Sequence, residues 1–473
     1  MIFNSLTFIV FFLVVLALHN LPLPWRAKKF NLLVASYIFY AVWNPPFVLL
    51  LVGSTVIDWI AARRLSEADR PAARRFWLGL SLLGNLGALS FFKYGNFLLQ
   101  NWQAAMSSIG VQYQAPEWNI ILPVGISFYT FQTLSYTLDV YLRRSKPLTS
   151  FLDFALFVTF FPQLVAGPIV RPGQLVPQFA TPRIATARQL AWGLALMTVG
   201  LFEKVVIADG ALAPTVDAVF GARAPVGFVD AWIGTLAFSG QIFCDFAGYS
   251  TTAIGAALCL GFSLPNNFRY PYAAIGFSDF WRRWHISLST WLRDYLYIPL
   301  GGNRRGVART YVNLLLTMLI GGLWHGANWT FVAWGGLHGL YLAVERWLAG
   351  RFAGSRAWNT TSGRVVLALV TYLLVNITWV FFRSPTFGGA AGMLIGMAGL
   401  QAAAVPVLAT TDLLLSGFCI LAIVCSHWIM RDRSLEELAE QVPTFAFAPA
   451  WATMLFLVIT SQGSGEAFIY FQF

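Results

Sequence analysis

The sequence predicts an all-α polytopic membrane protein, and two properties of the chain carry that prediction. Of its 473 residues, 58% are hydrophobic and only 11% are charged, whereas soluble domains usually carry about a quarter charged residues. The apolar runs do not alternate with polar residues, as residues 8–16 illustrate, which argues against the strands of a membrane β-barrel. At roughly 20 residues per crossing, the apolar windows allow about 10 to 12 transmembrane helices. We expect one integral membrane domain over residues 1–473.

The spanning helices are expected where the apolar windows lie, and two windows contain helix breakers. The windows lie near residues 2–18, 30–62, 76–97, 119–142, 151–166, 189–208, 227–262, 311–323, 329–348, 364–382, 409–430 and 446–461. Pro123 and Gly125 interrupt one window, and Pro162 and Pro168 interrupt or end the next. Non-helical backbone at membrane depth must be buried in protein or line a wet cavity. The breaks therefore predict re-entrant segments, with ordinary proline kinks as an equal alternative.

Basic residues concentrate in short connections between windows. Residues 26–29, 63–75 and 143–146 carry Arg and Lys, whereas residues 98–118 carry neither. Because Lys and Arg are retained on the cytoplasmic face, this alternation predicts cytoplasmic basic loops and a periplasmic N-terminus. It also accounts for the net charge of +11 without a nucleic-acid partner, so membrane lipid is the expected surrounding.

A helix over residues 280–297 is predicted to lie at the membrane interface. Its apolar residues recur at spacings of three and four, which makes one helical stripe. That stripe consists of Trp281, Trp284, Leu288, Trp291 and Tyr295. Arg282 lies off the stripe, and tryptophan with arginine suits the headgroup layer. Arg304 and Arg305 follow in a glycine-rich loop, where they could bind the phosphates of a ligand or simply mark a cytoplasmic loop.

Two histidines, His285 and His325, are the candidate catalytic residues. Ionisable groups in an apolar membrane chain are costly and functional by default, and histidine can take and return a proton near neutral pH. Three glycines flank His325 and allow close approach of a ligand. Trp324 supplies a wall there, and Asn328 an amide that could polarise a carbonyl. These residues predict acyl transfer, with a hydrogen-bonded core histidine as the structural alternative.

The remaining histidines are expected to be structural. His338 follows His325 by thirteen positions, about 220° around an ideal helix, so it is expected to pack elsewhere unless the helix breaks. His19 and His427 are expected to have no polar company and to lie at helix ends. A zinc site built on His285 and His325 lacks a third ligand, so no metal is expected.

Several stretches of the chain closely resemble the membrane-bound O-acyltransferase family, in the bacterial branch that O-acetylates alginate and D-alanylates teichoic acids. The most specific are residues 279–297, 301–304 and 321–327. Further likeness appears in residues 36–40, 91–94, 122–129, 166–169 and 245–250. The resemblance covers most of residues 1–350. It departs from the alginate-type pattern at Thr251, where an acidic residue is expected.

The resemblance implies a fold and a function. The fold is a ring of tilted helices, with re-entrant and interfacial helices, around a central tunnel. His325 corresponds to the catalytic histidine and His285 to a second polar site residue. His325 would act as general base, His285 or Asn328 would hold the acyl carbonyl, and Trp324 and Arg282 would contact substrate.

The implied reaction is O-acetylation of an exported polysaccharide such as alginate or cellulose, at the bacterial inner membrane. Acetyl-CoA is the expected cytoplasmic donor, with no bound cofactor, and Arg304 and Arg305 are the residues that could bind its phosphates. A periplasmic acetyltransferase and the exopolysaccharide machinery are the expected partners. The alternative is a proton-coupled transporter in which His325 and Asp245 relay protons, although the chain lacks the paired half-length repeats of many transporters.

Overall fold

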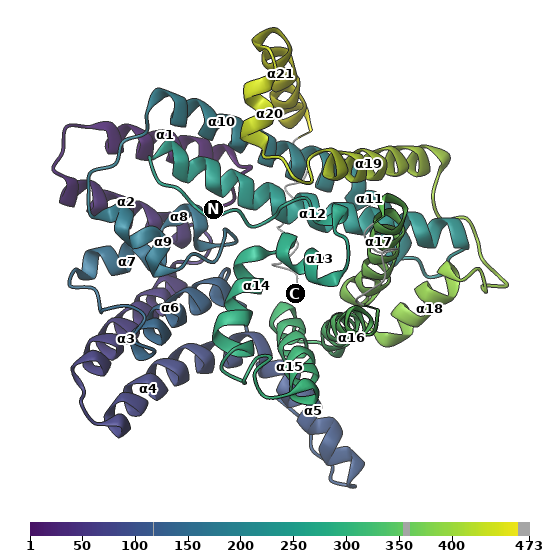
Figure 1. The fold of residues 1–473 in the computed structure, drawn as a ribbon, viewed down its shortest axis with the longest axis horizontal. Coiled ribbons are helices and arrows are strands. Elements are labelled where there is room, and N and C mark those ends of the chain that lie inside the picture. Colours follow the sequence, from purple (N-terminus) through teal and green to yellow (C-terminus); the bar gives the residue numbers. More distant parts are fainter. Residues whose placement is uncertain (117, 353–359, 462–473) are drawn as a thin grey trace. The chain divides into compact units, whose positions relative to one another are not determined.

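The regular structure consists of helices in a computed structural model that describes residues 1–116, 118–352 and 360–461 (Figure 1). Within these ranges, seven helices are long and apolar enough to cross a membrane, and three shorter apolar helices accompany them. The seven are Pro45–Glu67, Pro71–Ser108, Ala187–Phe220, Phe228–Cys259, Val307–His325, Thr361–Arg383 and Thr410–Ile429. The predicted all-α polytopic class is confirmed, and the chain is a multi-pass membrane protein.

The chain divides into two compact units by its internal contacts. The first comprises Met1–Leu196 and Ala253–Pro265, and the second comprises Met197–Thr252 and Asn266–Phe473. Two helices, α10 (Ala187–Leu201) and α12 (Phe228–Cys259), contribute residues to both units. The single domain expected over residues 1–473 stays a prediction.

The first unit is built from the N-terminal helices. They are α1 (Leu6–Asn20), α2 (Trp25–Ala41), η1 (Pro45–Phe47), α3 (Val48–Glu67), α4 (Pro71–Leu89), η2 (Ser90–Tyr94), α5 (Gly95–Ser108), α6 (Ile126–Tyr141), α7 (Phe151–Thr159), α8 (Phe161–Leu164), α9 (Pro172–Leu175) and η3 (Val176–Phe179). Helix α3 packs against α4 and α6 (Figure 1). A buried carboxylate joins these three, because Asp58 accepts hydrogen bonds from Asn85 (2.7 Å) and Thr137 (2.9 Å).

The two windows with helix breakers contain non-helical backbone that is packed in protein. Gly125 has a φ of 74°, and a Cβ there would lie 2.9 Å from the Leu164 carbonyl oxygen, so the two breaks meet. The Tyr40 hydroxyl donates to the Val124 carbonyl at 3.0 Å. The Phe161 N–H donates to Ser36 Oγ at 3.1 Å. These bonds satisfy the freed backbone groups, as membrane depth requires.

The second unit holds the remaining helices. They are η4 (Phe202–Leu212), α11 (Ala213–Phe220), η5 (Pro271–Ala273), α13 (Phe277–Arg283), α14 (Ile286–Leu292), η6 (Arg293–Tyr297), α15 (Val307–His325), α16 (Trp329–Arg351), α17 (Thr361–Arg383), α18 (Phe387–Met397), α19 (Thr410–Ile429), α20 (Leu435–Gln441) and α21 (Thr444–Thr460). Helices α15 and α16 pack against each other over much of their length. A Cβ on Gly335 would lie 2.2 Å from the Met318 carbonyl oxygen, so glycine allows the backbones to touch.

Candidate active site

His285 occupies a tight turn between two short helices. Helix α13 ends at Arg283, Trp284 is extended, and His285 has a left-handed φ of 41° before α14 begins. The continuous helix predicted over residues 280–297 is therefore wrong. The physical reason is a contact with Asn267, whose carbonyl accepts the Ile286 N–H at 2.8 Å and so takes a donor that a continuous helix would use internally.

Asn267 also fixes the start of α14. Its Oδ1 accepts hydrogen bonds from the Ser287 N–H (3.2 Å) and the Ser287 hydroxyl (2.9 Å). The result is that Trp284 and His285 are both fully buried within the second unit. The tryptophan stripe thus packs partly into protein, with Trp284, Leu288 and Trp291 all buried.

His325 lies at the end of α15, where the chain also leaves helical geometry. Gly326 is extended, and a Cβ on it would lie 2.1 Å from the Phe331 ring. No larger residue fits there without moving that ring, which explains the glycine after the histidine. Asn328 then caps the N-terminus of α16, and its Oδ1 accepts the Thr330 N–H at 3.0 Å. His325 is 2% exposed.

The structure brings His285 and His325 together. Their ring centroids are 6.2 Å apart with the planes at 58°. Aromatic side chains surround the pair: the Trp324 ring lies 5.8 Å from His285 and 5.0 Å from His325, and the Phe246 ring lies 4.7 Å from His285. The Trp334 ring also lies 5.0 Å from His325. Two imidazoles in an aromatic enclosure can exchange protons with a bound substrate while bulk water is restricted.

Burial controls the protonation of His285. Desolvation lowers the pKa of His285 from 6.5 to about 3, so the ring is neutral at physiological pH. A neutral imidazole offers one N–H donor and one acceptor nitrogen. His285 can therefore donate a hydrogen bond to a polarised oxygen without carrying charge.

The other predicted substrate contacts differ in their placement. Both polar atoms of the Asn328 amide make structural hydrogen bonds: Oδ1 accepts from the Thr330 N–H, and Nδ2 donates to the Pro385 carbonyl at 2.8 Å. Arg282 is exposed on α13, and its Nε donates to the Ser278 carbonyl at 3.0 Å. Arg304 and Arg305 are exposed in the connection before α15. Contacts of these residues with substrate stay predictions, and Trp324 alone among them lies against both histidines.

The remaining histidines have polar partners. His338 is fully buried in α16, and its Nε2 lies 3.0 Å from the Thr378 hydroxyl, consistent with a packing role. The helix does break between His325 and His338, so the angular argument does not apply. His19 Nε2 lies 2.9 Å from the Arg183 carbonyl, and His427 Nδ1 accepts the Tyr272 N–H at 3.2 Å. The expectation that these two lack polar company is wrong.

The second unit also contains a cluster of charged side chains that the sequence did not predict. Lys204, on the π-helical turn η4, forms ion pairs with Asp209 (2.8 Å) and with Asp245 of α12. The signal available was a lysine and an acid, Lys204 and Asp245, within apolar windows, with Asp209 just after the end of one. Within the described ranges, no group of three or more His, Cys, Asp or Glu side chains is placed to hold a metal ion.

Known proteins resemble this chain along most of its length. The model of the membrane-bound O-acyltransferase family matches residues 75–382, which include both site histidines. The chain is 46% identical to the probable alginate O-acetylase of Pseudomonas aeruginosa, over 81% of this chain and 72% of that protein. It is 40% identical to the peptidoglycan O-acetyltransferase of Helicobacter pylori, over 85% and 80%. It is 28% identical to the teichoic acid D-alanyltransferase of Bacillus subtilis, over 58% and 71%.

Proposed function

We propose that this chain, which belongs to the membrane-bound O-acyltransferase family and is a membrane acyltransferase, moves acetyl groups from cytoplasmic acetyl-CoA toward an exported polysaccharide. The relatives support an acetyl group over D-alanine, because the two acetylating relatives are 46% and 40% identical and the D-alanylating one is 28% identical. A periplasmic acetyltransferase that completes the transfer, and the polysaccharide export machinery, are the proposed partners. The bacterial inner membrane is the proposed location.

The observation that carries the proposal is the pairing of His285 with His325, whose ring centroids lie 6.2 Å apart. One histidine alone would fit a packing role. Two histidines from different elements, each beside Trp324, supply both functions that acyl transfer needs. One removes a proton from the acceptor, and the other stabilises charge on the acyl oxygen.

In the proposed step, the acceptor hydroxyl attacks the thioester carbonyl carbon while His325 takes its proton. The N–H of neutral His285 donates to the carbonyl oxygen, where negative charge develops. As the new C–O bond forms, the C–S bond breaks, and the proton on His325 passes to the departing thiolate. The products are an acetyl ester and free CoA thiol, and both histidines return to their starting state.

Arg304 and Arg305 are the proposed contacts for the donor's phosphates. Both are exposed in a loop that contains three glycines with positive φ, and such a loop can adapt to an anion. The alternative is a cytoplasmic loop with no role in donor binding. Changing both to Gln should raise the KM for acetyl-CoA without lowering kcat. An unchanged KM in a variant that inserts normally would remove this assignment.

The transporter alternative is disfavoured by the charge arrangement around Asp245. That carboxylate is buried and ion-paired with Lys204, which makes it a poor partner in a proton relay. The family membership points to an enzyme in any case.

Acetyl transfer in cells tests the proposal. In a strain that lacks this chain, expression of the chain should restore labelled acetyl esters on the exported polysaccharide. The label would be radioactive acetate for whole cells and radioactive acetyl-CoA for inverted membrane vesicles. Labelled polysaccharide that is independent of the chain would contradict the proposal. Proton-coupled solute uptake without acetylation would favour the transporter.

A further inference from the structure

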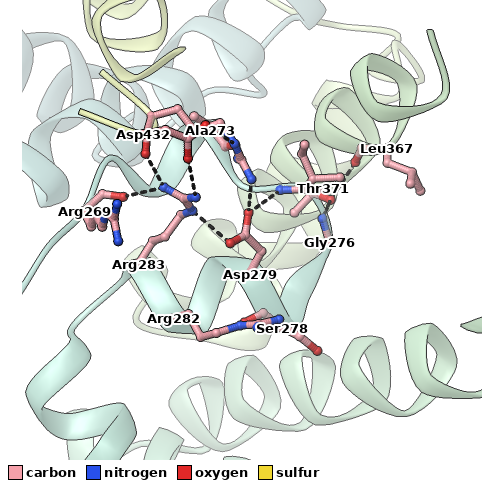
Figure 2. Close-up of polar contacts among 12 residues, drawn as sticks. Arg269, Ala273, Gly276, Ser278, Asp279, Arg282, Arg283, Leu367, Thr371 and Asp432 are labelled. Atoms are coloured by element: carbon pink, nitrogen blue, oxygen red, sulfur yellow. Dashed lines mark hydrogen bonds and ion pairs between the residues drawn. The ribbon is translucent and has the colours of Figure 1, made fainter. Parts of the chain in front are cut away.

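A network of charged side chains holds the segment that precedes His285. Asp279 on α13 accepts a hydrogen bond from Arg283 Nε at 2.9 Å, and Figure 2 shows the two side chains pointing toward each other. Arg283 also donates through Nη1 to the Arg269 carbonyl at 3.3 Å. The Arg283 carbonyl in turn accepts the Arg269 N–H at 2.9 Å. The last residue of α13 is thus tied on both its side chain and its backbone.

Arg431 joins this network from a remote part of the chain. It follows α19 and lies beyond residue 382, where the match to the family model ends. Its Nη2 donates to Asp279 Oδ2 at 2.7 Å, and its Nη1 donates to the Ala273 carbonyl. Its own carbonyl accepts a hydrogen bond from Arg283 Nη1 at 2.9 Å. One residue therefore contacts the side chain of Asp279, the side chain of Arg283 and the backbone before α13.

These contacts bear on His285 because its backbone conformation is strained. A left-handed φ is unfavourable in a residue other than glycine, and it persists only where the surroundings impose it. Arg283 and Trp284 lead directly into that turn, and Asn267 holds the residues after it.

The charged groups in the network are mostly buried, so each of them depends on its partners for charge compensation. The Arg283, Arg431 and Asp279 side chains are 9%, 13% and 19% exposed. Removing one partner from such a set leaves the others uncompensated in a poorly solvated place. The remaining groups would rearrange, and the turn that they hold would relax with them.

We propose that Arg431 is a positioning residue that, through Asp279 and Arg283, keeps His285 in its left-handed turn beside His325. The inference rests on the proposed acetyl transfer at these two histidines. It assigns a role to a part of the chain outside the family match. Because Arg431 acts on the placement of a group that meets the reacting carbonyl, its loss lowers kcat and leaves donor binding intact. A displacement of about 1 Å is worth up to about 10²-fold in such a step.

Arg431→Gln tests the proposal, with Arg433→Gln as the matched control. Arg433 is exposed two positions away, and its N–H, not its side chain, makes its hydrogen bond to Met430. In Arg431→Gln we expect kcat for acetyl transfer to fall about tenfold or more, with the KM for acetyl-CoA within about twofold of wild type. Arg433→Gln should retain wild-type kcat. Arg431→Lys should restore part of the loss, because an ammonium can keep the pairing with Asp279 but not the fork to the Ala273 carbonyl.

A second readout separates positioning from general loosening and does not depend on acetyl transfer. In the detergent-solubilised protein, carbethoxylation of His285 by diethylpyrocarbonate, followed by mass spectrometry, should be faster in Arg431→Gln than in wild type. His19, which is 2% exposed and belongs to the first unit, should keep its wild-type rate. A kcat within twofold of wild type, equal acceleration at both histidines, or loss of the variant from the membrane would each overturn the proposal. If the wild-type chain itself transfers no acetyl groups, the proposed function fails, and the two histidine rates alone decide this inference.

Discussion

Because His285 is buried as a neutral imidazole, the free energy of unfolding should fall in mild acid. The pKa of His285 is lowered by burial from 6.5 to about 3. Between these values the unfolded chain binds a proton at this residue that the folded chain excludes. The free energy of unfolding therefore falls by about 1.4 kcal/mol per pH unit as the pH drops below 6.5. The contribution is complete above pH 6.5 and is lost progressively toward pH 3. At about pH 5 the loss amounts to about 2 kcal/mol.

His285→Gln removes this titration, and comparing it with wild type isolates the contribution of one residue. The free energy of unfolding would be measured by SDS titration in mixed micelles, for both proteins, at about pH 7.5 and pH 5. Other titrating groups affect both proteins alike and cancel in the comparison. Wild type should lose about 2 kcal/mol more than His285→Gln between the two pH values. Equal losses in the two proteins would mean that His285 is solvated or charged in the folded state, and the neutral donor in the proposed step would be refuted.

Two further predictions concern packing and topology. Gly335→Ala should lower the free energy of unfolding by about 1–3 kcal/mol, because its Cβ would meet the Met318 carbonyl of the adjoining helix. Gly336→Ala should be nearly neutral, because its Cβ would meet only a leucine methyl at 3.4 Å. Equal effects of the two substitutions would contradict the close contact between the helices. In a Cys-free variant, a membrane-impermeant thiol reagent added outside the cell should label Ser108→Cys and spare Ala68→Cys. The reason is that the five arginines of residues 63–75 predict that this segment is cytoplasmic. The reverse labelling pattern would invert the topology and the side from which the donor binds.

The class of the fold and the pair of histidines were accessible from the sequence. A low content of charged residues and long apolar windows indicate directly that the protein is surrounded by lipid. The glycines around His325 were recognisable as points of close approach, and Gly326 proves to be in contact with the Phe331 ring. Non-helical backbone near Gly125 was likewise visible, because glycine and proline act locally.

What the sequence did not reveal depends on contacts between distant residues. Spacings of three and four across residues 280–297 describe a good helix, and the break at His285 is caused by Asn267. Arg431 lies about 150 positions from Asp279, and no local pattern links the two. The capping role of Asn328 could have been inferred, since Asn before an apolar helix is a typical N-cap.

The turnover of His325→Ala tests the central claim most directly. A general base contributes roughly 10²- to 10⁴-fold to such a step, so acetyl transfer per molecule of membrane-inserted protein should fall by that factor. His338→Ala is the matched control, because it removes a buried histidine whose hydrogen-bond partner is Thr378 and which reaches the site only through the Trp334 ring, and its loss should stay below about tenfold. Near-normal turnover in His325→Ala, or a loss that only follows the disappearance of the protein from the membrane, would contradict catalysis by His325.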